Sequence, residues 1–153
     1  LKGYFQKNKR EILDEFFALL KFESISSEIP FKGEVEKCAQ YLLEKAKKIG
    51  FETTLWKTKG HPIVFAKDLS AGPKAPTLLI YNHYDVQPVD PLELWANPPF
   101  SPTMIGNDIF ARGAQDNKGQ CFYVLKALQA YKELNGHFPI NIKWLIEGEE
   151  EVG

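Results

Sequence analysis

Two short apolar segments, each followed at once by a cluster of polar side chains, constrain the fold of this chain most. They span residues 77–81 and 140–146, and they end in Asn-His-Tyr-Asp and in Glu-Gly-Glu-Glu-Glu. The first segment shows no alternation of polar and apolar residues, which predicts a strand that is covered on both faces and lies centrally in its sheet. The second segment is also typical of a core strand. Buried strands of this kind require helices packed against the sheet.

Apolar side chains elsewhere recur at helical spacing. This spacing predicts helices over residues 8–21, 34–49 and 117–134. Asn8 and Glu11 resemble a capping box at the start of the first helix, and Gly50 is placed to end the second. Short β-rich runs at residues 51–56 and 62–66 predict a strand pair at one side of the sheet.

Residues 86–107 contain five prolines, too many for a helix interior or a central strand, and we expect an ordered loop there. No repeat, low-complexity tract or linker divides the chain. The order of elements therefore predicts an α/β fold with a mixed, mostly parallel sheet covered by helices. We expect residues 1–153 to be the N-terminal part of a single catalytic domain.

Composition excludes several classes of function. The 153 residues are 44% hydrophobic with a formal net charge of −1, which indicates an ordinary globular domain without electrostatic attraction to nucleic acid or anionic membranes. No apolar run approaches the roughly 20 residues of a membrane helix, and the N-terminus lacks a signal-peptide core, so we expect a cytoplasmic protein. Cys38 and Cys121 are expected to be free, buried thiols.

Three places in the chain carry metal-type ligands. His83 and Asp85 are two residues apart, which places both side chains on one side of an extended backbone. Asp116 precedes a predicted helix, and Glu149, Glu150 and Glu151 follow the second core strand. Each has an ordinary explanation alone: a turn histidine with a capping carboxylate, a helix N-cap, and a solvated acidic run. Together, at the carboxyl side of one sheet, they suit a metal bound by nitrogen and oxygen donors.

The amino-acid sequence around these ligands resembles that of one protein family. The strings HYDVQP, W-x-x-PPFSP, ARGAQDNKGQ and IEGEEEVG, in this order over residues 76–153, are similar to the M20 metallopeptidases, which include dipeptidases, carboxypeptidases and aminoacylases. Val86-Gln87-Pro88 and the residues after Asp116 are most similar to the cytosolic nonspecific dipeptidase (carnosinase-like) branch. One departure is Gly106-Asn107, where many relatives have an Asp-Gly turn; the swap keeps turn chemistry.

The resemblance assigns a role to each candidate residue. It implies that two divalent ions, zinc or alternatively manganese, are held by His83 on one metal, Asp116 between both, and Glu151 on the second. It further implies that Asp85 orients His83 and that Glu150 is the general base of peptide hydrolysis. Glu149 then has no chemical role, and the peptide bond after Asp116 is expected to be cis.

The resemblance also implies that further ligands, a lid domain and a homodimer interface come from sequence beyond this chain. We therefore expect the chain alone to bind metal weakly and to be inactive. Two alternatives stay open: an M20-type aminoacylase or deacylase, and a noncatalytic α/β binding domain. Among the remaining residues, we expect His61 to lie at the surface and Lys118 either to pair with a site carboxylate or to be solvated.

Overall fold

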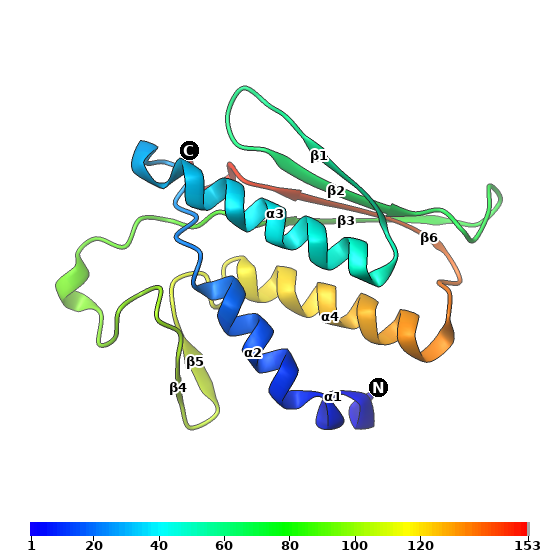
Figure 1. The fold of residues 1–153 in the computed structure, drawn as a ribbon, viewed down its shortest axis with the longest axis horizontal. Coiled ribbons are helices and arrows are strands. Elements are labelled where there is room, and N and C mark those ends of the chain that lie inside the picture. The colour runs from blue at the N-terminus through cyan, green and yellow to red at the C-terminus, as the bar shows by residue number, and fades with distance from the viewer. Residues whose placement is uncertain (153) are drawn as a thin grey trace.

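The computed structural model describes residues 1–152. A four-stranded sheet in the order β1-β2-β6-β3 lies along one side of the molecule, and the long helices lie together on one face of it (Figure 1). A separate hairpin, β4–β5, lies apart from this sheet. Within the described residues no helix combines the length and apolar character needed to cross a bilayer.

The elements follow the predicted order. The helices are α1 (Lys2–Lys7), α2 (Lys9–Leu20), α3 (Lys32–Ile49) and α4 (Lys118–Asn135), with 3-10 turns η1 (Ile29–Phe31), η2 (Leu92–Leu94) and η3 (Glu150–Val152). The strands are β1 (Glu52–Trp56), β2 (Ile63–Asp68), β3 (Thr77–His83), β4 (Thr103–Ile105), β5 (Asp108–Phe110) and β6 (Asn141–Glu147). All three predicted helices and the strands predicted over residues 77–81 and 140–146 are therefore present.

Helix ends show which local signals decided the fold. Gly50 ends α3 in the left-handed region with φ of 104°, and Gly136 ends α4 with φ of 78°, both as expected of C-terminal glycines. The capping box at Asn8 is wrong. The Asn8 side chain makes no capping bond; it donates to the Tyr4 carbonyl 2.9 Å away, because the chain is already helical in α1 before it.

The sheet is mixed, as predicted, but antiparallel pairing predominates within the described residues. Strands β3 and β6 run parallel, whereas β2 pairs antiparallel with both β1 and β6. The expected central position of β3 is also wrong. It is β6 that lies between two neighbours, and β3 forms the edge of this sheet.

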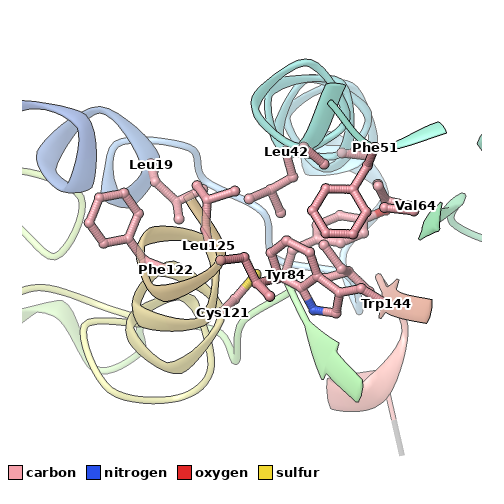
Figure 2. Packing of buried hydrophobic residues seen from close by; sticks show 14 of the residues in the cluster. Leu19, Leu42, Phe51, Val64, Tyr84, Cys121, Phe122, Leu125 and Trp144 are labelled. Carbon is pink, nitrogen blue, oxygen red and sulfur yellow. The ribbon is translucent and has the colours of Figure 1, made fainter. Parts of the chain in front are cut away.

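The core lies between the sheet and the helices. Helix α3 packs on β1 and β2, helix α4 packs on β3, and α2 packs on α4. Figure 2 shows the side chains that meet there, including Leu19, Leu42, Leu125, Val64 and Trp144, all of them buried. The predicted free thiols Cys38 and Cys121 are buried in the same cluster. Burial of this apolar surface is the main stabilising contribution to the fold.

The other face of the sheet is open in the described residues. Leu79 and Tyr81 of β3 keep 65% and 52% of their surface exposed, and Phe65 and Leu145 beside them are half-buried. The expectation that helices cover both faces therefore does not hold here, because α2, α3 and α4 all lie on the opposite face.

Asp68 joins the end of β2 to helix α4. Its carboxylate is buried and accepts hydrogen bonds from Lys132 Nζ at 2.7 Å and from Ser70 Oγ at 2.5 Å. Burial alone would raise the pKa of this carboxyl, but the bonds from Lys132 and Ser70 outweigh it and lower the pKa below its ordinary value. The folded state therefore favours the charged carboxylate.

This lowered pKa predicts acid sensitivity. The stabilisation is fully present above the unfolded pKa of about 3.9 and is lost as the pH falls through the lower folded pKa. We expect the free energy of unfolding in urea to decrease below about pH 4, and Asp68→Asn to reduce that decrease. Glu52→Gln, which changes an exposed partner of Lys67, should alter stability little. If the free energy of unfolding of Asp68→Asn decreased at low pH as much as that of the wild type, the stabilising role of the Asp68 carboxylate would be contradicted.

Candidate metal centre

The parallel pairing of β3 and β6 brings two of the sequence clusters together. His83 at the end of β3 lies opposite Glu147 at the end of β6, and the Tyr84 N–H donates to the Glu147 carbonyl at 2.9 Å. The side chains that follow β3 and β6 therefore meet at the carboxyl end of these strands, where open α/β sheets place their ligands. The expectation that these clusters share one end of the sheet is confirmed.

His83, Asp116 and Glu151 form the centre of the cluster. Each offers one donor atom, and these atoms all lie within 4.8 Å of one another. His83 is buried, Glu151 is half-buried, and Asp116 is exposed with 70% of its side chain accessible. An imidazole and two carboxylates at this spacing are a donor set that suits zinc or manganese.

Asp85 lies behind these residues and is completely buried. Its Oδ1 atom lies 3.3 Å from His83 Nδ1 and accepts the Glu150 N–H at 3.3 Å. Its Oδ2 atom accepts the Glu151 N–H at 2.9 Å and the Ser26 hydroxyl at 2.6 Å. One carboxylate thus contacts the histidine and fixes the backbone of both glutamates.

Acidic groups surround the His83 imidazole. Its Nε2 atom lies 3.2 Å from Asp116 Oδ1 and 3.7 Å from Glu150 Oε2, while Nδ1 faces Asp85. Burial by itself lowers the pKa of this imidazole, but the hydrogen bond and charge of Asp85, together with Glu150, outweigh burial and raise the pKa to about 9. The pocket therefore favours a positive charge at this position.

The loop before α4 is held by a chain of amide and indole contacts. The peptide bond between Asp116 and Asn117 is cis, as the resemblance implied. Asn117 Oδ1 accepts from Asn82 Nδ2 at 2.9 Å, and Asn82 Oδ1 accepts from Trp144 Nε1 at 2.9 Å. Gly119 sits so close to the Ala114 carbonyl that a Cβ atom would overlap it. Core strands β3 and β6 thereby fix the loop that carries Asp116.

This chain of contacts predicts that removing the indole N–H of Trp144 lowers the free energy of unfolding. Trp144→Phe should leave Asn82 Oδ1 buried without its donor and lower the free energy of unfolding by about 1–3 kcal/mol. Trp56→Phe is the control, because Trp56 is 41% exposed and stacks on Phe65 at the open face. We expect that control to change stability by less than about 0.5 kcal/mol. Equal values for the two variants in urea unfolding would contradict the proposed hydrogen-bond chain.

Several residues at the site were not predicted from the sequence. Ser26 and Asn82 carry no metal-type signal, since their role depends on contacts with residues 59 and 35 positions away. Gln87 belongs to the string HYDVQP, and its Nε2 donates to Glu151 Oε2 at 2.5 Å. The position of Gln87 in that motif was the only signal that could have identified it.

Two other predictions need correction. His61 is half-buried and not a freely exposed surface residue, and its Nε2 lies 2.9 Å from the Ser26 carbonyl, so it donates there in the matching tautomer. Lys118 is neither solvated nor paired with a site carboxylate. It is fully buried and donates from Nζ to the Phe22 carbonyl at 2.5 Å, because α4 begins beneath the loop that follows α2.

The mixed α/β sheet and the donor set at the ends of its parallel strands agree with the comparisons to known proteins. A sequence profile described as Peptidase family M20/M25/M40 matches residues 79–153, which contain every predicted site residue. Residues 79–153 therefore carry the sequence of the M20 peptidase family.

Individual relatives agree with this assignment. The Cys-Gly metallodipeptidase of Schizosaccharomyces pombe is 30% identical over 96% of this chain and 33% of its own length. An M20 family metallo-carboxypeptidase from Sulfolobus solfataricus is 43% identical with a TM-score of 0.82, over 93% of this chain and 31% of that one. Human carnosine dipeptidase 1 is 26% identical with a TM-score of 0.89, over 99% and 34%. The chain thus spans about a third of the length of these relatives.

Proposed function

We propose that this protein hydrolyses the amide bond of dipeptides or short peptides at a dinuclear metal site. The observation that carries the proposal is the grouping of His83, Asp116 and Glu151 donor atoms within 4.8 Å of one another, with Glu150 beside them. The names of the relatives point to dipeptides, so Cys-Gly and carnosine are the first substrates to test.

The residues present fit divalent ions. We assign His83 to one ion and Glu151 to the other, with the exposed Asp116 carboxylate shared between them. Zinc suits the mixed imidazole and carboxylate donors, and manganese is the alternative. Ions bound there supply Lewis acidity, which lowers the pKa of water and polarises the substrate carbonyl.

Glu150 is assigned to proton transfer. Its backbone N–H is fixed by Asp85, while its side chain is 46% exposed and its Oε2 atom lies 3.7 Å from His83 Nε2. Its carboxylate takes one proton from the attacking water as the new C–O bond forms. The same proton then passes to the nitrogen of the leaving amine as the C–N bond breaks, which yields a carboxylic acid and an amine.

Asp85 is assigned to orientation. Its contact with His83 Nδ1 leaves the other ring nitrogen, Nε2, directed toward Asp116. His83 Nε2 is the atom that would bind metal. Three expectations stay predictions. They are a cytoplasmic location, a homodimer formed through a lid domain, and the assignment of residues 1–153 to part of one catalytic domain.

The proposal is tested by hydrolysis assays on the full gene product. We expect turnover of Cys-Gly or carnosine that disappears after chelation and returns on addition of zinc or manganese. Turnover of N-acetyl amino acids in place of dipeptides would favour the acylase alternative. Activity that survives exhaustive chelation, or a protein that hydrolyses neither amide with metal present, would overturn the proposal.

The 153-residue chain assayed alone provides a second comparison. A catalytic zinc ion uses about three protein ligands, whereas the clustered donor set described above has three residues for two ions. We therefore expect weak zinc binding in calorimetric titration and no measurable turnover. Tight binding of two ions with hydrolysis would contradict this.

A further inference from the structure

A short segment between α2 and η1 lies directly behind the metal centre. Ile25 pairs with Val86 in a β-bridge, and the Val86 N–H donates to the Ser24 carbonyl at 3.0 Å. The Ser24 hydroxyl donates to the Tyr84 carbonyl at 2.7 Å. Ser24, Ile25 and Ser26 are all buried, and the segment packs along residues 84–86.

Ser26 is the one member of the segment that contacts a site carboxylate. Its hydroxyl donates to Asp85 Oδ2 at 2.6 Å, the shortest of the four contacts around that carboxylate. The other three come from His83 and from the backbone of Glu150 and Glu151. The Ser26 hydroxyl is therefore the only one of these contacts that arises outside the predicted site motifs.

Ser26 is itself held from the opposite side. Its carbonyl lies 2.9 Å from His61 Nε2, on the loop between β1 and β2. With the backbone fixed by this contact and by the neighbouring bridge at Ile25, the hydroxyl has little freedom to follow Asp85 if that side chain rotates. Asp85 must instead adopt the orientation that the hydroxyl defines.

We propose that Ser26 is a positioning residue for the metal centre. Its hydroxyl fixes the plane of the Asp85 carboxylate, so that Oδ1 faces the His83 imidazole and Oδ2 receives the Glu151 N–H. It thereby sets the direction of one ligand and the backbone position of another. This inference rests on the proposed function, since it presumes that His83 and Glu151 bind metal.

The alternative is a serine that merely satisfies a buried carboxylate without affecting metal binding. The chain offers a matched control in Ser24, which is buried in the same segment and donates to a carbonyl, not to Asp85. Loss of either hydroxyl should weaken folding. Only loss of the Ser26 hydroxyl should weaken metal binding.

The test is titration of the full gene product with zinc alone, against a chromophoric chelator, with urea unfolding measured in parallel. Removing an outer partner of a metal ligand typically costs 10–100-fold in affinity, and we expect this loss in Ser26→Ala. Ser24→Ala should lower the urea midpoint and leave zinc affinity within about twofold of the wild type. Ser26→Thr, which retains the hydroxyl, should restore affinity.

Ser26→Cys guards against misfolding of the alanine variant, because it keeps nearly the same volume but replaces the hydroxyl by a weak donor. It should fold and show the same loss of zinc affinity. If zinc affinity is lost in His83→Ala but unchanged in Ser26→Ala and Ser26→Cys, the positioning role is overturned and the proposed function stands. If the wild-type protein binds neither zinc nor, in the same titration, manganese, both are overturned.

Discussion

Glu150→Gln should lower the rate of dipeptide hydrolysis by about 10²–10⁴-fold, the usual contribution of a general base, while leaving the zinc content of the protein unchanged. The amide retains the shape of the side chain but cannot accept the proton of the attacking water at neutral pH. The backbone N–H of residue 150 would still donate to Asp85, so the local fold is preserved. The assay compares kcat for Cys-Gly with bound metal measured by atomic emission.

Glu149→Gln is the matched control for this experiment. Glu149 immediately precedes Glu150 and carries the same charge, but its carboxylate packs on the backbone at Gly60, away from His83. We expect its turnover to stay within about threefold of the wild type, as for substitutions away from the reacting groups. If Glu150→Gln retained full activity, or if Glu149→Gln lost as much, the assignment of the base would be wrong.

Local sequence signals predicted the secondary structure because each depends on neighbouring residues. Helical spacing located α2, α3 and α4, and the glycines at positions 50 and 136 end two of these helices as expected. The hairpin between β4 and β5 was not predicted, because residues 86–107 were expected to form a loop. Only its turn follows from local sequence, since the φ of 64° at Gly106 suits the first central position of a two-residue turn. Such features need no knowledge of the rest of the chain.

The position of β3 could not be predicted in the same way. An apolar strand indicates that both faces prefer cover, but not which strands pair with it or where the helices pack. In the described residues β6 takes the central position because β2 pairs with its other edge. Leu79 and Tyr81 then remain exposed on a face that local patterning had assigned to the interior.

The candidate site was likewise predicted only in part from the sequence. The approach of His83 and Glu151 followed from strand ends that a parallel pair must bring together, whereas Asp116, in the loop before α4, was assigned to the same site through the family resemblance. The structure confirms the grouping of all three. The residues that hold the group, Ser26 and Asn82, could not be found because serine and asparagine occur in many loops and turns. Their contacts depend on the tertiary packing of distant segments.

Asp85→Ala is expected to have the largest effect on stability of any substitution at the site. Asp85 is completely buried, and the change would leave the Ser26 hydroxyl and the N–H groups of Glu150 and Glu151 without their acceptor. Each buried unsatisfied donor costs about 1–3 kcal/mol, although such costs are not additive. Removing one partner of a buried charge pair costs about 3–5 kcal/mol, and we expect a loss of that size.

A second variant, Asp85→Asn, separates orientation of His83 from simple structural support. Asp85→Asn keeps the volume and one acceptor oxygen but loses the negative charge that faces His83 Nδ1. We expect Asp85→Asn to recover part of the stability in urea unfolding yet still bind zinc at least about tenfold more weakly than the wild type, because the imidazole loses the partner that directs it. Asp108→Ala, at an exposed carboxylate on β5, should change neither quantity. Recovery of full zinc affinity in Asp85→Asn would show that the charge of Asp85 has no part in orienting the ligand.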